Sequence, residues 1–262
     1  MNRKHFLTVF STTIVSLFLV LGLNLATPES TQARTNLLVS AAASLKEVME
    51  EIKPLYQKTA NVNLTYNFGA SGALLQQIEQ GAPADIFIAA AARQMNTLEQ
   101  NGALLSGTRA NLANNRLAIV VSNRTRGITS ISSLRNPEIK RIAIGEPRSV
   151  PAGHYAEQVF QKLNILNEVK PKFVYANNVR QVLAAVESGN VDAGLVYITD
   201  AKISNNVRTA VIVSDTYHSQ IVYPMAVLKR SKNAAAARAF VKYLSSGEAR
   251  GILRKYGFIV PK

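Results

Sequence analysis

Small and hydroxyl-bearing residues occupy four places in this sequence where a predicted strand is followed by a predicted helix. The first amide N–H groups of a helix have no partner within the helix and lie at the positive end of its dipole, so they can donate to an anion. The four junctions are residues 41–44, 69–72, 150–153 and 177–179. None of them contains Lys or Arg. This pattern predicts anion binding by neutral donors that select by the size and spacing of oxygens.

Each junction taken alone has a simpler explanation. Ser44 or Ser71 by itself is typical of an ordinary helix N-cap without a ligand. Tyr197, at the end of the apolar stretch 191–197, is equally typical of a core tyrosine whose hydroxyl is satisfied by the protein. Four junctions in one chain, two from each half, favour a shared anion site.

The elements that must position these junctions alternate between strand and helix. Such alternation predicts an α/β fold in which mostly parallel sheets carry helices on both faces. Ligands bind such open sheets beyond the carboxyl ends of the strands, where the four junctions lie. The apolar periodicity predicts strands at 36–43, 62–68, 84–89, 116–122, 141–145, 169–175, 191–197, 207–213 and 220–228, and helices at 44–58, 73–80, 93–100, 128–134, 154–163, 179–188, 234–244 and 247–256.

The N-terminus reads as an export signal. Arg3 and Lys4 precede an apolar run over 6–25, and small residues end the segment at Ala33. This order predicts a signal peptide over 1–33 that is cleaved after Ala33, and hence a periplasmic protein. The run is just long enough to cross a bilayer, so a retained anchor is the alternative. The sequence has no cysteine, which excludes disulfides, thiolate metal sites and a lipid-modified N-terminal cysteine.

The charge is strongly basic and unevenly placed. The chain has 30 Lys and Arg against 16 Asp and Glu, a formal charge of +14. Residues 222–262 contain nine basic residues and one acidic residue. This segment either raises the local anion concentration or meets an anionic surface, or it is simply a solvated face. No nucleic-acid partner is expected, because export removes the usual partner and no recognised binding module is present.

Several longer motifs are more specific than the junctions. They are AAASL at 41–45, FGASGALLQQIEQGAPADIFIAA at 68–90, VPAGHYA at 150–156, NNVRQVLAAVESGNVDAGLVYITDA at 177–201, YPMAVLK at 223–229 and RKYGF at 254–258. Through them, nearly all of 36–262 resembles the periplasmic molybdate-binding proteins of ABC transporters, within the type II solute-binding proteins. The resemblance implies capture of molybdate, and also of tungstate, for delivery to an importer.

The resemblance also implies the residues of the site. In that family the oxyanion is held by hydroxyl groups and backbone amides, which by motif are those of Ser44, Ser71, Ala152, Val179 and Tyr197. Molybdenum is then present only as the bound oxyanion, with no direct protein ligand to the metal and no cofactor. The second loop of this chain has fewer serines than many relatives, which bears on affinity or selectivity.

The resemblance further implies a two-lobed periplasmic binding protein. Lobe 1 would comprise 34–114 plus 222–262, and lobe 2 would comprise 115–221, joined by crossing segments near 113–117 and 218–224. The ligand would bind between the lobes, which close around it by a hinge motion. The expected partners are a membrane permease and its cytoplasmic ATPase, and the expected state is a monomer.

An enzyme is the alternative from a different class. Residues 69–73 read GASGA, one residue away from the G-x-S-x-G nucleophile elbow of serine hydrolases. The second glycine is misplaced, and beyond the signal the only possible histidine bases are His154 and His218. There is no H-E-x-x-H motif and no Cys/His cluster for metal catalysis. The sequence therefore predicts that the protein is not an enzyme.

Other oxyanions remain open within the binding-protein class. Phosphate carries a proton at neutral pH and benefits from a carboxylate acceptor, which the four junctions lack. Asp85 and Asp192 lie in predicted strands, and Asp200 follows Tyr197. Sulfate differs from molybdate in size alone, and the sequence does not separate tungstate from molybdate.

Overall fold

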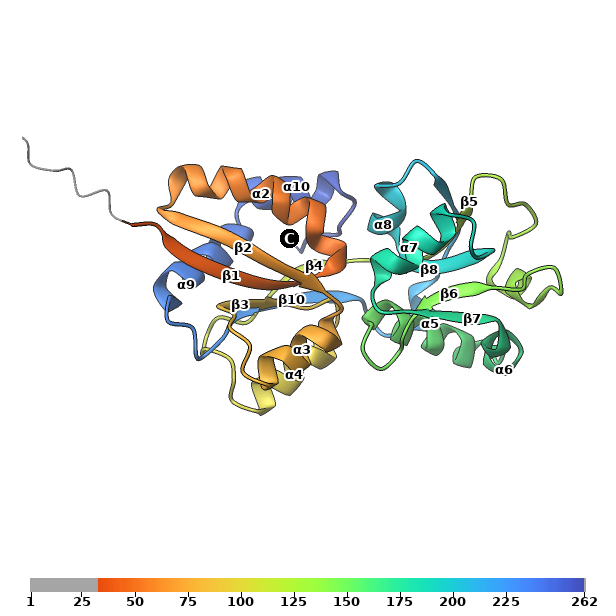
Figure 1. Cartoon of the computed structure of the whole chain (residues 1–262), viewed down its shortest axis with the longest axis horizontal. Coiled ribbons are helices and arrows are strands. Elements are labelled where there is room, and N and C mark those ends of the chain that lie inside the picture. The colour runs from red at the N-terminus through yellow and green to blue at the C-terminus, as the bar shows by residue number, and fades with distance from the viewer. Residues whose placement is uncertain (1–32, 262) are drawn as a thin grey trace, which may run out of the picture. The chain divides into compact units, whose positions relative to one another are not determined.

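The computed structural model describes residues 33–261, which form two five-stranded sheets (Figure 1). The first sheet has the strand order β2-β1-β3-β10-β4. Strands β2, β1 and β3 are parallel, whereas β10 is antiparallel to both of its neighbours. The strands are β1 (Thr35–Ala42), β2 (Val62–Gly69), β3 (Ile86–Ile88), β4 (Ala110–Asn114) and β10 (Val222–Val227).

The second sheet repeats this plan with the order β7-β6-β8-β5-β9. Here β7, β6 and β8 are parallel, and β5 is antiparallel to both β8 and β9. Each sheet is therefore mixed, with one strand reversed against the other four, and the predicted α/β class with mostly parallel strands is confirmed. The strands are β5 (Leu117–Ser122), β6 (Ile142–Gly145), β7 (Phe173–Ala176), β8 (Ala193–Tyr197) and β9 (Val207–Ile212).

Helices cover both faces of each sheet, as Figure 1 shows. On the first sheet, α3 and α4 lie on one face, and α2, α9 and α10 lie on the other. Helices α9 and α2 contact each other through Phe240 and Tyr56, whose ring centroids are 4.9 Å apart. On the second sheet, α5 and α6 lie opposite α7 and α8. The helices are α2 (Lys46–Thr59), α3 (Ser71–Glu79), α4 (Ala92–Gln100), α5 (Pro151–Lys162), α6 (Leu166–Val169), α7 (Val179–Glu187), α8 (Ile198–Lys202), α9 (Ala234–Leu244) and α10 (Gly247–Lys255), with 3-10 turns η1 (Ala43–Leu45), η2 (Ile131–Arg135), η3 (Lys170–Lys172) and η4 (Asp215–Tyr217).

Two helices begin earlier than the apolar periodicity predicts. Helix α5 starts at Pro151 rather than at 154, because proline suits the first helical position, where its missing N–H costs nothing. Helix α3 starts at Ser71 rather than at 73. By contrast, α7 starts where it was predicted, because the side chain of Asn178 accepts the N–H groups of the next turn. These starts bring helix N-termini to the edges of both sheets.

The structure corrects two further sequence predictions and adds two elements that were not predicted. The strand predicted at 169–175 begins only at Phe173, because the preceding residues form α6 and η3. The helix predicted at 128–134 is the 3-10 turn η2. Strand β4 and helix α8 were not predicted, since each is short and only partly apolar.

The chain passes between the sheets twice. Residues 115–116 connect β4 to β5, and residues 213–221 connect β9 back to β10. Both connections overlap the crossing segments predicted near 113–117 and 218–224. The predicted signal peptide falls outside the described residues, apart from Ala33. Within residues 33–261, no helix has the length and apolar character needed to cross a membrane.

Candidate functional site

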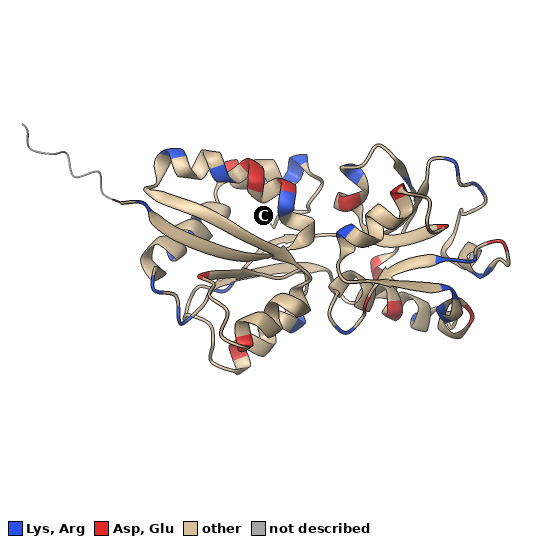
Figure 2. Cartoon of the chain, in the orientation of Figure 1, with Lys and Arg blue, Asp and Glu red and all other residues tan. Residues whose placement is uncertain are grey.

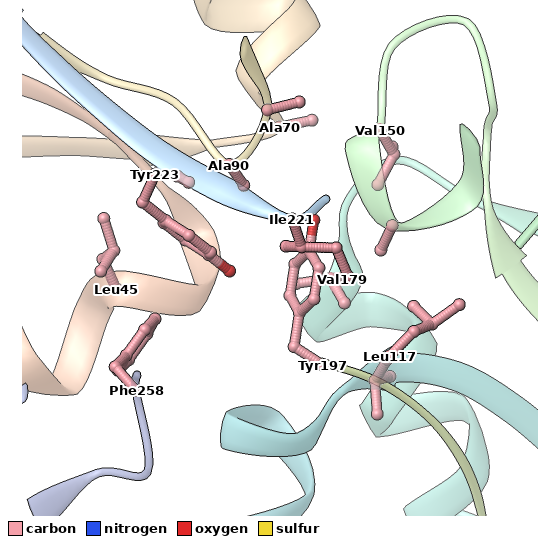
Figure 3. Packing of buried hydrophobic residues seen from close by; sticks show 14 of the residues in the cluster. Leu45, Ala70, Ala90, Leu117, Val150, Val179, Tyr197, Ile221, Tyr223 and Phe258 are labelled. Carbon is pink, nitrogen blue, oxygen red and sulfur yellow. The ribbon is translucent and has the colours of Figure 1, made fainter. Parts of the chain in front are cut away.

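A small cavity lies where the two sheets face each other. The volume of this cavity is about 10 Å³. All five residues predicted for the site line this cavity, together with their neighbours in the four junctions. The lining comprises Ala42, Ala43, Ser44, Gly69, Ala70, Ser71, Ala90, Val150, Pro151, Ala152, Asn178, Val179 and Tyr197. Figure 3 shows Ala70 and Ala90 on one side of this region and Val150, Val179 and Tyr197 on the other.

Backbone amides supply the first set of donors. Ser71, Ala152 and Val179 occupy the first or second positions of α3, α5 and α7, and Ser44 lies in η1. Within residues 33–261, the N–H groups of these four residues donate to no protein acceptor. Unpaired N–H groups at helix starts favour negative charge. The cavity is therefore suited to an anion.

The two serine hydroxyls are held in place by hydrogen bonds to the protein. Ser71 Oγ accepts the N–H of Ala90 at 2.9 Å. Ser44 Oγ lies 2.9 Å from the hydroxyl of Tyr223. Both serines are buried, at 3% exposure or less. Because Ser71 already accepts a hydrogen bond, its own hydroxyl hydrogen is available to the cavity.

The hydroxyl of Tyr197 is the strongest single indication of a ligand. The Tyr197 side chain is 1% exposed. Its hydroxyl interacts with the Tyr223 hydroxyl but has no hydrogen-bond partner of acceptable geometry among the described residues. Burial raises the pKa of the Tyr197 hydroxyl well above its ordinary value, so the group is a neutral donor. A buried hydroxyl without a partner costs about 1–3 kcal/mol. An acceptor bound in the cavity would offset that cost. A tyrosine with only a core role would instead have its hydroxyl satisfied by the protein.

The charged groups near the cavity pair with one another behind its wall. Arg180 Nε lies 2.8 Å from Asp200 Oδ1, and Arg180 Nη1 donates to Glu47 Oε1 at 3.0 Å. Asp200 Oδ2 accepts the N–H of Tyr197 at 3.1 Å. Burial raises the pKa of Asp200 to about 6, although Arg180 opposes the shift. The side chain of Arg148, the other nearby arginine, is 91% exposed. No charged residue lines the cavity.

Groups from the two sheets also meet directly beside the cavity. The N–H of Gly72, in α3, donates to the carbonyl oxygen of Ser149 at 2.9 Å. A Cβ atom at Gly72 would lie 2.6 Å from that oxygen, closer than real Cβ atoms approach. Arg180 likewise joins α7 of the second sheet to Glu47 of α2, which packs on the first. The approach of the two halves thus depends on a glycine and an ion pair.

Among the described residues, neither histidine is placed to act as a base for Ser71. His154 contacts Gln158, with 3.1 Å between their Nε2 atoms, and His218 Nδ1 lies 2.8 Å from the carbonyl oxygen of Ser219. Neither histidine lines the cavity that contains Ser71. Residues 33–261 contain no cluster of three or more His, Cys, Asp or Glu able to hold a metal ion. The arrangement is chemically a set of donors rather than a reactive centre.

Sequence reasoning missed the residues that support the cavity from behind. Tyr223 contacts Ser44, Asn115 donates to Tyr223, and Glu47 pairs with Arg180, but none of these three residues lies at a junction. The sequence offered one partial signal, since Tyr223 opens the motif at 223–229. The partners themselves become visible only when segments more than 100 residues apart are placed side by side.

Comparisons with known proteins agree with this picture. Residues 37–259 match the family described as bacterial extracellular solute-binding protein. A Bacillus subtilis protein named "Putative ABC transporter substrate-binding lipoprotein YvgL" is 40% identical over 98% of this chain and 99% of its own length. The molybdate-binding protein ModA of Haemophilus influenzae is 33% identical over 94% and 97%, respectively. The solved periplasmic molybdate-binding protein of Azotobacter vinelandii shares the fold, with a TM-score of 0.78 at 24% identity, covering 86% of this chain and all of that chain.

Proposed function

This chain belongs to the bacterial extracellular solute-binding proteins of ABC transporters, and we propose that the solute it binds is molybdate, with tungstate as a second ligand. Family membership agrees with the prediction of an exported protein that is not an enzyme. The names of its relatives support molybdate. The proposed ligand contacts are those predicted from the sequence, at Ser44, Ser71, Ala152, Val179 and Tyr197.

The unpartnered hydroxyl of Tyr197 is the observation that carries this proposal. It is buried at the edge of a cavity in which four free amides and two serine hydroxyls can also donate. A group of donors without an acceptor matches an anion whose oxygens all accept. No carboxylate lines the cavity, so a protonated anion would find no charged acceptor for its hydrogen.

The small volume favours a compact ligand. Pockets for organic ligands usually measure about 300–1,000 Å³, far more than the space found here. The three aspartates considered above as acceptors for phosphate accept backbone N–H groups instead. Asp85 accepts the N–H of Leu38 at 2.9 Å, Asp192 accepts that of Lys140 at 2.8 Å, and Asp200 accepts that of Tyr197. This arrangement supports a fully ionised oxyanion over hydrogen phosphate.

The proposed mechanism is closure of two lobes, 34–114 with 222–262 and 115–221, about the two crossing segments. Ser44 and Ser71 would contribute donors from the first lobe, and Ala152, Val179 and Tyr197 from the second. Only the closed form would make both sets of contacts, so the ligand would favour closure. The closed protein would then deliver the anion, as a monomer, to a permease powered by a cytoplasmic ATPase.

Calorimetric titration of ligand-stripped protein with molybdate, tungstate, sulfate and phosphate at equal ionic strength tests this proposal. We expect tight binding of molybdate and tungstate and exclusion of phosphate. Preferential binding of sulfate would reassign the ligand within the same class. Absence of binding by all four anions would refute an oxyanion receptor.

A further inference from the structure

We propose that Asn115 and Tyr223 are positioning residues that force the Ser44 hydroxyl to donate into the cavity, and that they thereby help to exclude protonated oxyanions. This inference rests on the proposed function, since it concerns selectivity at the same site. Neither residue lines the cavity, so neither is a ligand contact. Their effect passes through Ser44.

The three side chains form a buried row. Tyr223, in β10, is fully buried, and its hydroxyl lies 2.9 Å from Ser44 Oγ. Asn115 Nδ2 donates to the Tyr223 hydroxyl at 3.3 Å and to Thr199 Oγ1 at 2.9 Å. In Figure 3, the hydroxyl of Tyr223 points from the side of Leu45 toward the region of Tyr197. Asn115 lies on the first segment that crosses between the sheets, so the row links that segment to the site.

The direction of donation along this row follows from its far end. The N–H of Arg116 donates to Asn115 Oδ1 at 2.9 Å, which places the oxygen of the amide there and its NH₂ group toward Tyr223. The Tyr223 oxygen therefore accepts. Its own hydrogen then goes to Ser44 Oγ, 2.9 Å away, rather than to the Tyr197 hydroxyl, which also interacts with Tyr223 but lies outside hydrogen-bond geometry. Burial raises the pKa of the Tyr223 hydroxyl well above its ordinary value, so that hydrogen is retained.

Ser44 is thus left with a single role toward the ligand. Its oxygen accepts from Tyr223, and its hydrogen is free only for the cavity. A serine without this constraint can rotate and present a lone pair instead. With Ser44 held as a donor, its remaining lone pair can accept the proton of a ligand only if the hydrogen of Ser44 itself is left unpaired. An anion that carries a proton therefore loses one acceptor for that proton. Unpaired buried polar groups are costly, so such an anion is rejected.

The substitution Tyr223→Phe removes the middle of the row and keeps the ring that packs 5.3 Å from Phe258. We expect molybdate affinity to fall about ten-fold through loss of one hydrogen bond that orders a ligand contact. Hydrogen phosphate affinity, measured by competition, should not fall with it, because Ser44 can then also accept. The matched control is Tyr243→Phe, which removes an exposed hydroxyl bonded to Glu248, 2.7 Å away, and should change neither affinity. An equal loss for both anions, or none, would contradict the inference.

The isosteric change Asn115→Asp tests the direction itself. A carboxylate at 115 accepts from Tyr223, so Ser44 must donate to Tyr223 and present a lone pair to the cavity. The added negative charge should weaken both anions, but the ratio of molybdate to hydrogen phosphate affinity should drop at least ten-fold. An unchanged ratio in this variant would overturn the inference while leaving the proposed function intact. Failure of the unmodified protein to bind molybdate would instead overturn both.

Discussion

Replacing Tyr197 by Phe separates a ligand contact from a core role. The hydroxyl is buried and unpartnered within the described structure, so its removal deletes no protein hydrogen bond. The stability of the ligand-free protein should therefore stay the same or rise, because an unsatisfied buried hydroxyl costs about 1–3 kcal/mol. A hydrogen bond to a charged ligand contributes about 1.5–3 kcal/mol, so molybdate should bind roughly 10- to 150-fold more weakly.

Two measurements on the same protein check this expectation. Urea unfolding without ligand gives the stability of Tyr197→Phe, and calorimetric titration gives its molybdate affinity. The control is Tyr256→Phe, whose hydroxyl donates to Glu51 Oε2 at 2.8 Å, away from the cavity. A large loss of ligand-free stability, or unchanged molybdate affinity, would show that the Tyr197 hydroxyl serves the fold, and would remove the main support for the proposed site.

Three further predictions test the other parts of the site. Ser44→Ala and Ser71→Ala should each weaken molybdate binding by about 1.5–3 kcal/mol in calorimetry, and unchanged affinity in both would refute the site assignment. Gly72→Ala should weaken binding without lowering ligand-free stability, because the added methyl obstructs approach of the halves; normal affinity would show that this contact is not needed for closure. The pKa of Asp200 is raised from 3.8 to about 6, so the folded state binds more protons between these values and stability should rise as pH falls through 6 toward 4. Urea unfolding of this protein and of Asp200→Asn should show that the free energy of unfolding gains about 3 kcal/mol more in the unmodified protein over this pH range. Parallel pH profiles for the two proteins would refute this prediction.

The fold was predictable wherever a local pattern was strong. The burial of Ile119 and Val120 in β5, and of Ala193 and Leu195 in β8, follows from apolar runs that only a strand covered on both faces can bury. The error at 169–175 arose where Pro171 and two lysines form a short 3-10 turn that no apolar periodicity marks. Short, half-polar elements such as β4 depend on neighbours supplied by the rest of the chain, which the local sequence does not reveal.

The site likewise has parts that the sequence predicted and parts that it did not. Its donors were predictable because helix starts and small residues are local features, and the cavity contains all five predicted residues. Their supports were not, because Tyr223 and Asn115 are ordinary core residues until the fold places them beside Ser44, 179 residues from Tyr223 in sequence. Arg180 directly follows the last junction in sequence, and only the structure shows that it pairs with Glu47 and Asp200.

That pairing bears on how such a site would release its anion. An unpaired guanidinium in the wall would attract a dianion by several kcal/mol whether the lobes were open or closed. Arg180 is instead compensated by two carboxylates, so the attraction comes mainly from short-range donors divided between the halves. On the proposed mechanism, opening the lobes removes the contacts of one half together, three of them in the case of the second lobe. At about 1.5–3 kcal/mol each, those three contacts amount to about 4–9 kcal/mol, enough to weaken binding by at least about a thousand-fold. A wall of neutral donors thus allows tight capture when closed and release when the transporter separates the lobes.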